Sequence, residues 1–140
     1  MLVMKRLFEY ICVALLSLCA ACSQKAPLVP EKYATVDAKP VIYPDYTDVV
    51  VPCNIAPLVF RVADDATDFV TRFAAGDVSF VYGGSEVAPA ADEWRSLMEC
   101  ARGGAVKVEV YANQADGWKK YEPFSIAVSP DSIDRYISYR

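Results

Sequence analysis

Hydrophobic residues in the second half of the chain follow the spacing of β-strands. From Val106 to Tyr111 apolar and polar residues alternate strictly, which predicts a strand with one face on a core and the other in water. Short runs rich in β-branched or aromatic residues predict further strands over 49–51, 58–62, 69–73, 78–82 and 118–128, the last broken at Pro123. Gly83-Gly84 predicts a tight hairpin turn after residue 82.

A helical spacing occurs once along this part of the chain. Four apolar residues recur at i, i+3, i+4 and i+7 and form a single face: Trp94, Leu97, Met98 and Ala101. Asp92 is predicted to be the N-cap, with Glu93 in the first turn, and Gly103-Gly104 is predicted to end the helix. About six short strands and one short helix predict a mainly β domain over 41–140, an antiparallel immunoglobulin- or fibronectin-like β-sandwich.

The first 21 residues have the organisation of a signal peptide. Lys5 and Arg6 form a basic start, and Tyr10 to Ala21 then run for 12 residues without a charge. That run is too short to cross a bilayer, which takes about 20 apolar residues. Residues 1–21 are therefore predicted to be removed from the mature protein.

The signal peptide ends in a motif that predicts lipidation. Leu18-Cys19-Ala20-Ala21-Cys22 resembles a bacterial lipobox, in which small residues precede a cysteine that becomes acylated. Cys22 is the predicted lipidation site, and its acyl chains would hold the protein to the membrane almost permanently. The alternative is ordinary cleavage after Ala21, which would leave a free thiol on Cys22.

Residues 22–40 are predicted to form a flexible tether. They contain Pro27, Pro30 and Pro40, and they show no apolar period. After Cys22 the segment Ser23-Gln24-Lys25-Ala26 contains no acidic residue, so it does not resemble an acidic surface-export signal. This favours a lipid-anchored protein of the cell envelope, on the periplasmic side of the outer membrane.

Composition excludes several classes of function. The chain has 140 residues, a net charge of −4 and no His, and 54 % of it is apolar. An acidic chain has no electrostatic footprint for nucleic acid, so no nucleic-acid partner is expected. Without His there is no Ser-His-Asp triad or Cys-His dyad, and the commonest metal ligand is missing. We therefore expect no enzyme activity and no cofactor.

Two cysteines and one acidic cluster are candidate sites. Cys53 and Cys100 could pair in an oxidising compartment, or they could remain two unpaired buried thiols. Asp64, Asp65 and Asp68 do not have the ligand spacing of a calcium loop, so a solvated turn is the stronger interpretation and no metal site is expected.

Aromatic residues offer a possible ligand surface. Trp94 and Trp118 could stack on sugar rings if they were exposed on one face. Trp94, however, lies on the apolar stripe of the helix, and Trp118 begins a strand in which aromatic residues are favoured. A role in the core is therefore the stronger interpretation for both.

Two segments resemble a known family. The stretches from Tyr43 to Val49 and from Pro52 to Phe60 are similar to the opening of Bacteroidota lipoproteins in which a β-sandwich precedes a TolB-like β-propeller. Shorter matches continue to Arg140, where those proteins go on into the propeller, so the domain is interpreted as truncated before it. The resemblance implies a non-catalytic accessory or interaction module whose partner is its own propeller or another protein. The alternative is a glycan-binding surface lipoprotein.

Overall fold

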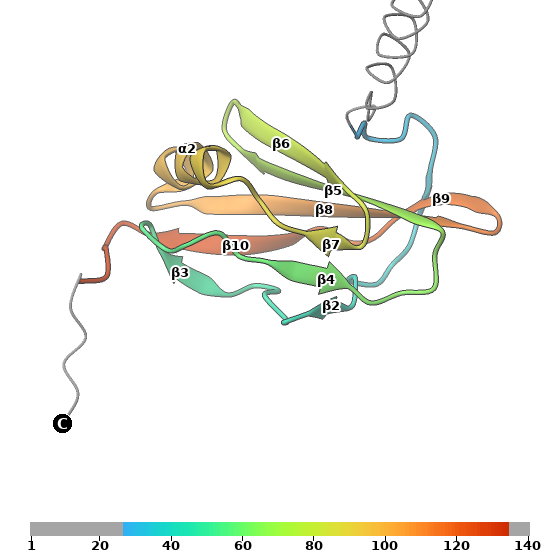
Figure 1. Ribbon diagram of the computed structural model, residues 1–140, viewed down its shortest axis with the longest axis horizontal. Helices are drawn as coiled ribbons and strands as arrows, with labels where there is room; N and C mark the ends of the chain where they lie inside the picture. The colour runs from blue at the N-terminus through green and yellow to red at the C-terminus, as the bar shows by residue number, and fades with distance from the viewer. Residues whose placement is uncertain (1–26, 135–140) are drawn as a thin grey trace, which may run out of the picture.

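The computed structural model describes residues 27–134 as two β-sheets and one helix (Figure 1). The large sheet has seven strands: β1 (Ala34–Thr35), β3 (Val50–Pro52), β5 (Asp68–Ala75), β6 (Val78–Gly83), β8 (Ala105–Gln114), β9 (Gly117–Lys120) and β10 (Phe124–Ser129). The small sheet has three: β2 (Ile42–Tyr43), β4 (Phe60–Val62) and β7 (Glu86–Val87). The helix is α2 (Ala91–Ala101).

The long strand β8 organises the large sheet. One edge of β8 pairs with β5, which in turn pairs with β6. The other edge is shared by β10 and β9, and the parallel strands β3 and β1 extend the sheet beyond them. The chain between β9 and β10 contains Pro123, which confirms the predicted break there.

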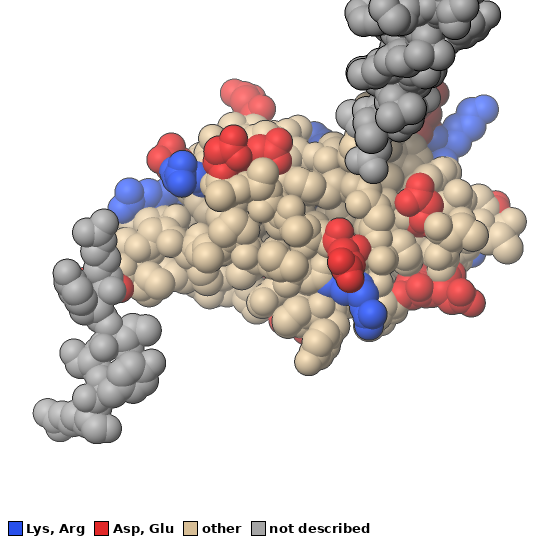
Figure 2. Space-filling model, in the orientation of Figure 1, with Lys and Arg blue, Asp and Glu red and all other residues tan. Residues whose placement is uncertain are grey.

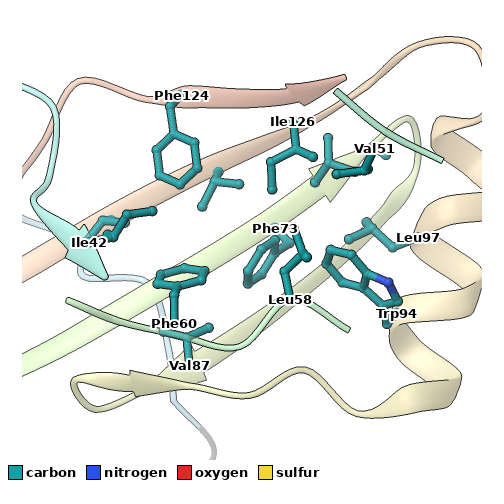
Figure 3. Close-up of a cluster of buried hydrophobic side chains, with 14 of the residues drawn as sticks. Ile42, Val51, Leu58, Phe60, Phe73, Val87, Trp94, Leu97, Phe124 and Ile126 are labelled. Atoms are coloured by element: carbon teal, nitrogen blue, oxygen red, sulfur yellow. The ribbon is translucent and has the colours of Figure 1, made fainter. Parts of the chain in front are cut away.

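The core fills the space between the large sheet and the layer made by the small sheet and α2. Phe73 is fully buried at its centre, 6.2 Å from the Phe60 ring and 6.1 Å from the Trp94 ring (Figure 3). The remaining core residues are mainly aliphatic, including Val106, Val108 and Val110 of β8. The predicted fold class, mainly β and sandwich-like with one short helix, is confirmed, although two of the strand pairs are parallel.

The helix presents the predicted face but begins earlier than predicted. Its four apolar residues are all buried. The N-cap is Ala90, which makes no side-chain capping bond, so Asp92 lies in the first turn with Glu93. Acidic residues in a first turn favour a helix through its dipole, even when neither of them caps it. The helix ends as predicted, with Gly103 in a left-handed conformation at φ +74°.

The predicted hairpin at Gly83-Gly84 is wrong. This turn carries the chain out of the large sheet, and β7 pairs with β4 of the small sheet. The hairpin of this region instead joins β5 and β6 through Gly76 and Asp77, where Gly76 has φ +52°. Both turns contain glycine, and the sequence alone did not distinguish which of them keeps the two strands in one sheet.

The described part of the predicted tether, 27–40, lies along the domain. Within it, β1 pairs with β9, the Val36 amide donates to the Lys120 carbonyl at 2.9 Å, and the Ala38 carbonyl accepts from the Glu122 amide at 2.9 Å. This extended segment is therefore an edge strand rather than a free linker. It reaches the domain near β9, whereas the described chain leaves beyond β10 and β3, at the other end of the long axis (Figure 1).

Candidate functional site

A groove of about 520 Å³ opens at the end of the domain where the described chain leaves. Its walls are the loop after β3, one side of α2, and the segment that follows β10. The lining residues are Cys53, Asn54, Ile55, Ala56, Pro57, Ala91, Trp94, Arg95, Met98, Glu99, Arg102 and Ser132. We call it the C-terminal groove.

The floor of the C-terminal groove is apolar and firmly held. Trp94 and Met98 are each only 2 % exposed, because the helix turns both side chains toward the core. The indole nitrogen of Trp94 donates to the carbonyl of Ile55 at 3.1 Å, which fixes the loop against the helix. These two side chains support the groove from within the core, and the apolar surface open to a partner is that of Ile55, Ala56 and Pro57 in the loop.

Charged and polar groups form the rim of the C-terminal groove. Arg95 and Glu99 are exposed on α2. Arg102 donates from Nε and Nη2 to the Pro130 carbonyl, at 3.0 and 2.8 Å. This mixture of an apolar floor and a charged rim is typical of a protein–protein contact.

The segment after β10 is fastened to the same loop. Asn54 donates to the Ile133 carbonyl and accepts from the Ile133 amide, both at 2.9 Å. The Ile133 side chain itself is 58 % exposed. The outgoing chain is thus held in a defined direction past the mouth of the C-terminal groove.

The two cysteines considered for a disulfide are both free. The Cys53 thiol faces the carbonyls of Pro130 and Asp131, each at 3.6 Å. The Cys100 thiol lies on α2, 3.1 Å from the Ala75 carbonyl. The disulfide is therefore not formed in this structure, and the alternative of two separate thiols describes it, although Cys100 is exposed rather than buried.

A cluster of charged groups lies on the outer face of the large sheet, the face turned away from the core. Glu109 has a side chain that is only 5 % exposed, and it accepts from Arg72 at 3.3 Å, Lys107 at 3.0 Å and Lys120 at 2.7 Å. Burial acts to raise the pKa of Glu109, but the hydrogen bonds and charges of Lys120 and Lys107 outweigh it, so this pKa lies below its usual range. The carboxylate is a fixed counter-charge for three cations, and one of them, Lys120, also lines a pocket of about 370 Å³ together with Tyr33.

Only part of the outer face of β8 is in water as predicted. Tyr111 is 2 % exposed because the ring of Tyr33, from the segment before β1, packs edge-on against it at 5.3 Å. The ammonium of Lys120 lies 5.6 Å from the Tyr33 ring centroid and 5.5 Å from that of Tyr111. The predicted alternation holds for the core side of β8; on the other side Lys107 is exposed as predicted, whereas Tyr111 is covered by Tyr33 of the amino-terminal segment.

Trp94 cannot serve as a ligand-stacking residue, because it is buried in the core. Trp118 lies opposite Asn113 at the end of β8 and is half-buried. The two tryptophans lie on different elements, one on α2 and one on β9, and they form no common face. The preferred interpretation, a role in the core, therefore describes Trp94, whereas the half-buried Trp118 keeps part of its ring accessible.

The acidic cluster at 64–68 forms an exposed turn and the start of β5. Asp64 accepts from the Gln114 side chain at 3.2 Å and from the Asp65 amide at 2.8 Å. Between residues 27 and 134 no group of three potential ligands gathers around a metal-sized space.

In the view of Figure 2 most of the surface is uncharged, with acidic groups over α2 and toward the end where β9 lies.

Cys22 and the signal peptide lie outside the described residues. In the part of the chain that the structure describes, no helix has the length and apolar character needed to cross a membrane. Comparisons with protein-family models, with curated proteins and with solved structures find no match.

Proposed function

We propose that this protein is a lipid-anchored lipoprotein of the cell envelope whose domain is a non-catalytic interaction module. The observation that carries the proposal is the C-terminal groove, with apolar surface of Ile55, Ala56 and Pro57 open in its wall, a charged rim and the outgoing chain fastened at its mouth. Such a surface can seat apolar side chains of a protein partner. The amino-terminal segment reaches the domain near its other end, so an anchor and a partner would not compete for space (Figure 1).

The polar groups of the domain support binding better than catalysis. Its most buried charge, Glu109, is neutralised by Lys120 and two further cations. The Cys53 thiol has no basic side chain among its hydrogen-bond partners. A nucleophile is commonly activated by an adjacent general base, and no such side chain is among the hydrogen-bond partners of this thiol.

The resemblance of residues 43–60 to the lipoproteins with a TolB-like propeller suggests which partner the C-terminal groove would take. A propeller that followed residue 140, or one on a separate chain, would approach from the side where Ile133 leaves the domain. Ile133 is exposed and apolar, so it would add to the same contact. On this proposal the protein faces the periplasm from the outer membrane.

The anchor is tested by a Cys22→Ala variant of the full chain. The expected result is loss of incorporated radiolabelled palmitate and release of the protein from the membrane pellet. Cys53→Ala is the matched control, since it removes a thiol from the domain and leaves the lipobox intact. Membrane pelleting that is unchanged in Cys22→Ala would contradict the lipid anchor.

The binding role is tested by placing a photo-crosslinking residue at Ala56, which is exposed in the wall of the C-terminal groove. Irradiated membranes should give one discrete protein adduct, which mass spectrometry would identify. Ala115, exposed in the turn between β8 and β9, is the matched control. Equal adducts from both positions, or none from Ala56, would argue against a partner at this groove.

For the glycan-binding alternative, the aromatic residues that remain accessible lie on the outer face of the large sheet. Tyr33 is 43 % exposed there, and Trp118 is half-buried on the neighbouring strand β9. Affinity electrophoresis in gels containing envelope polysaccharide would test it, with Trp118→Ala expected to abolish retardation. Retardation that is lost when Trp118 is substituted and retained when Ala56 is substituted would favour a glycan over a protein partner.

A further inference from the structure

The strand β6 is an edge of the large sheet, and in residues 27–134 the side of it away from β5 pairs with no strand, although Pro27 lies against Gly83 at its end. It pairs with β5 along six residues, from Val78 to Gly83, and with no other strand. Figure 1 shows it at the margin of the sheet. Within residues 27–134, no backbone hydrogen bond joins Val78–Tyr82 to any element other than β5.

The other edge strands of this fold are protected in the usual ways. β1, β2 and β7 have only two residues each. β3 has three and ends at Pro52, which has no amide to donate. Very short strands and proline are devices by which proteins keep sheet edges from pairing with other chains.

β6 has none of these devices. Its sequence is Val-Ser-Phe-Val-Tyr-Gly, without a charge or a proline. Val78, Phe80 and Tyr82 pack partly against the core, which keeps the strand flat against the inner layer. A six-residue neutral edge of this kind is a template for an added strand.

We propose that the strand added to β6 is β6 of a second copy of this protein, paired antiparallel about a twofold axis. A neutral strand with a single charge at its start is compatible with a second copy of itself as partner, and that charge favours the antiparallel direction. Asp77 precedes β6, whereas the glycines Gly83 and Gly84 end it. Antiparallel pairing sets Asp77 beside the neutral glycine end of the other copy, while parallel pairing would set the two Asp77 carboxylates together.

The side chains are also compatible with a twofold contact. If the axis is perpendicular to the sheet and passes midway between the Phe80 residues of the two copies, the copies keep their inner faces on the same side of the joined sheet. The two α2 helices then cover one continuous sheet. Such an interface is isologous, so it closes as a dimer. The inference is independent of the lipid anchor and of the C-terminal groove.

Cysteine crosslinking of the full chain in detergent tests this pairing. In a background with Cys12, Cys19, Cys22, Cys53 and Cys100 all replaced by Ser, Ser79→Cys supplies a single thiol on the exposed outer face of β6, so the result does not depend on acylation of Cys22. A short bis-maleimide should convert this purified variant to a covalent dimer. Ser125→Cys is the matched control, because Ser125 is exposed in the same cross-strand row, on β10, which has strands on both sides.

A second substitution separates pairing from misfolding. Val81→Lys, added to the Ser79→Cys variant, places a lysine of each copy near the axis and should lower the dimer yield at least ~tenfold, because like charges across a strand pair repel. The melting temperature of the two variants is compared to confirm that both are folded. No dimer from Ser79→Cys, equal dimer from Ser125→Cys, or an adduct of another mass in native membranes would each overturn the proposal.

Discussion

The ammonium of Lys120 on β9 lies 2.7 Å from Oε1 of Glu109 on the neighbouring strand β8, beside the Tyr33 ring of the amino-terminal segment. Lys107 and Arg72 complete the cluster at 3.0 and 3.3 Å. A nearly buried carboxylate is stable here because three cations share it, and each cation loses a partner if the charge is removed.

Glu109→Gln should therefore destabilise the domain. The amide keeps the volume of the side chain but leaves three cations close together without a counter-charge. Because two of the cations are about half exposed, we expect a loss of about 1–2 kcal/mol in the free energy of unfolding. Urea denaturation measures it, with Lys107→Ala as the control that should cost under about 0.5 kcal/mol. Equal losses in the two variants would show that Glu109 is not the centre of the cluster.

The same group gives a dependence on pH with a definite sign. The folded state lowers the pKa of Glu109 from its usual value of 4.5. Its contribution to stability is then fully present above that value and is lost as the pH falls through the lower folded pKa. The difference in unfolding free energy between wild type and Glu109→Gln should shrink between about pH 6 and about pH 3. A difference that stays constant would contradict the assignment to Glu109.

Tyr33 is expected to hold the amino-terminal segment on the sheet. Its ring contacts Tyr111 and Lys120, and pairs of this kind are worth about 0.5–1.5 kcal/mol. Tyr33→Ala should speed tryptic cleavage after Lys32 while the melting temperature changes little. Tyr43→Ala is the control, because that side chain is 74 % exposed on the small sheet. If both variants are cut at the wild-type rate, the segment is held by its backbone alone.

Local patterns predicted the elements well, and contacts between distant segments explain the differences. The face of α2 and the core side of β8 follow from spacing alone, since each is set by neighbours along the chain. The burial of Tyr111 depends on Tyr33, which is far away in the sequence, and no local pattern contains it. The proline-rich composition of 27–40 is typical both of a tether and of an edge strand. The C-terminal groove joins three segments, so no single motif could predict it.

Trp94 supports the floor of the C-terminal groove both by packing and by a hydrogen bond. Two substitutions of this residue should show how much each of them contributes to the free energy of unfolding. Trp94→Phe keeps most of the apolar volume but leaves the Ile55 carbonyl without its donor, at an expected cost of about 1–3 kcal/mol. Trp94→Ala also opens a cavity and should cost about 3–5 kcal/mol. Thermal unfolding followed by circular dichroism measures both, with Trp118→Phe as the half-buried control. A larger loss in Trp118→Phe than in Trp94→Phe would reverse the assignment of Trp94 to the core.

Thr71 gives a prediction of opposite sign, an increase in stability. It is fully buried in β5, opposite Val110, and its hydroxyl has no hydrogen-bond partner among the described residues. Thr71→Val replaces that hydroxyl with a methyl group of similar size, so the cost of burying an unpaired polar group, about 1–3 kcal/mol, is removed. The urea midpoint should rise with an unchanged slope, which would indicate the same folded and unfolded states.

The control for this substitution is Thr67→Val, in the loop just before the same strand. The Thr67 hydroxyl donates to the Asn113 carbonyl at 2.9 Å, so its removal should lower the midpoint slightly. The two threonines thus undergo the same chemical change with opposite expected signs, and the presence of a partner for the hydroxyl is what distinguishes them. A midpoint that falls for Thr71→Val would mean that the hydroxyl has a partner, such as a buried water.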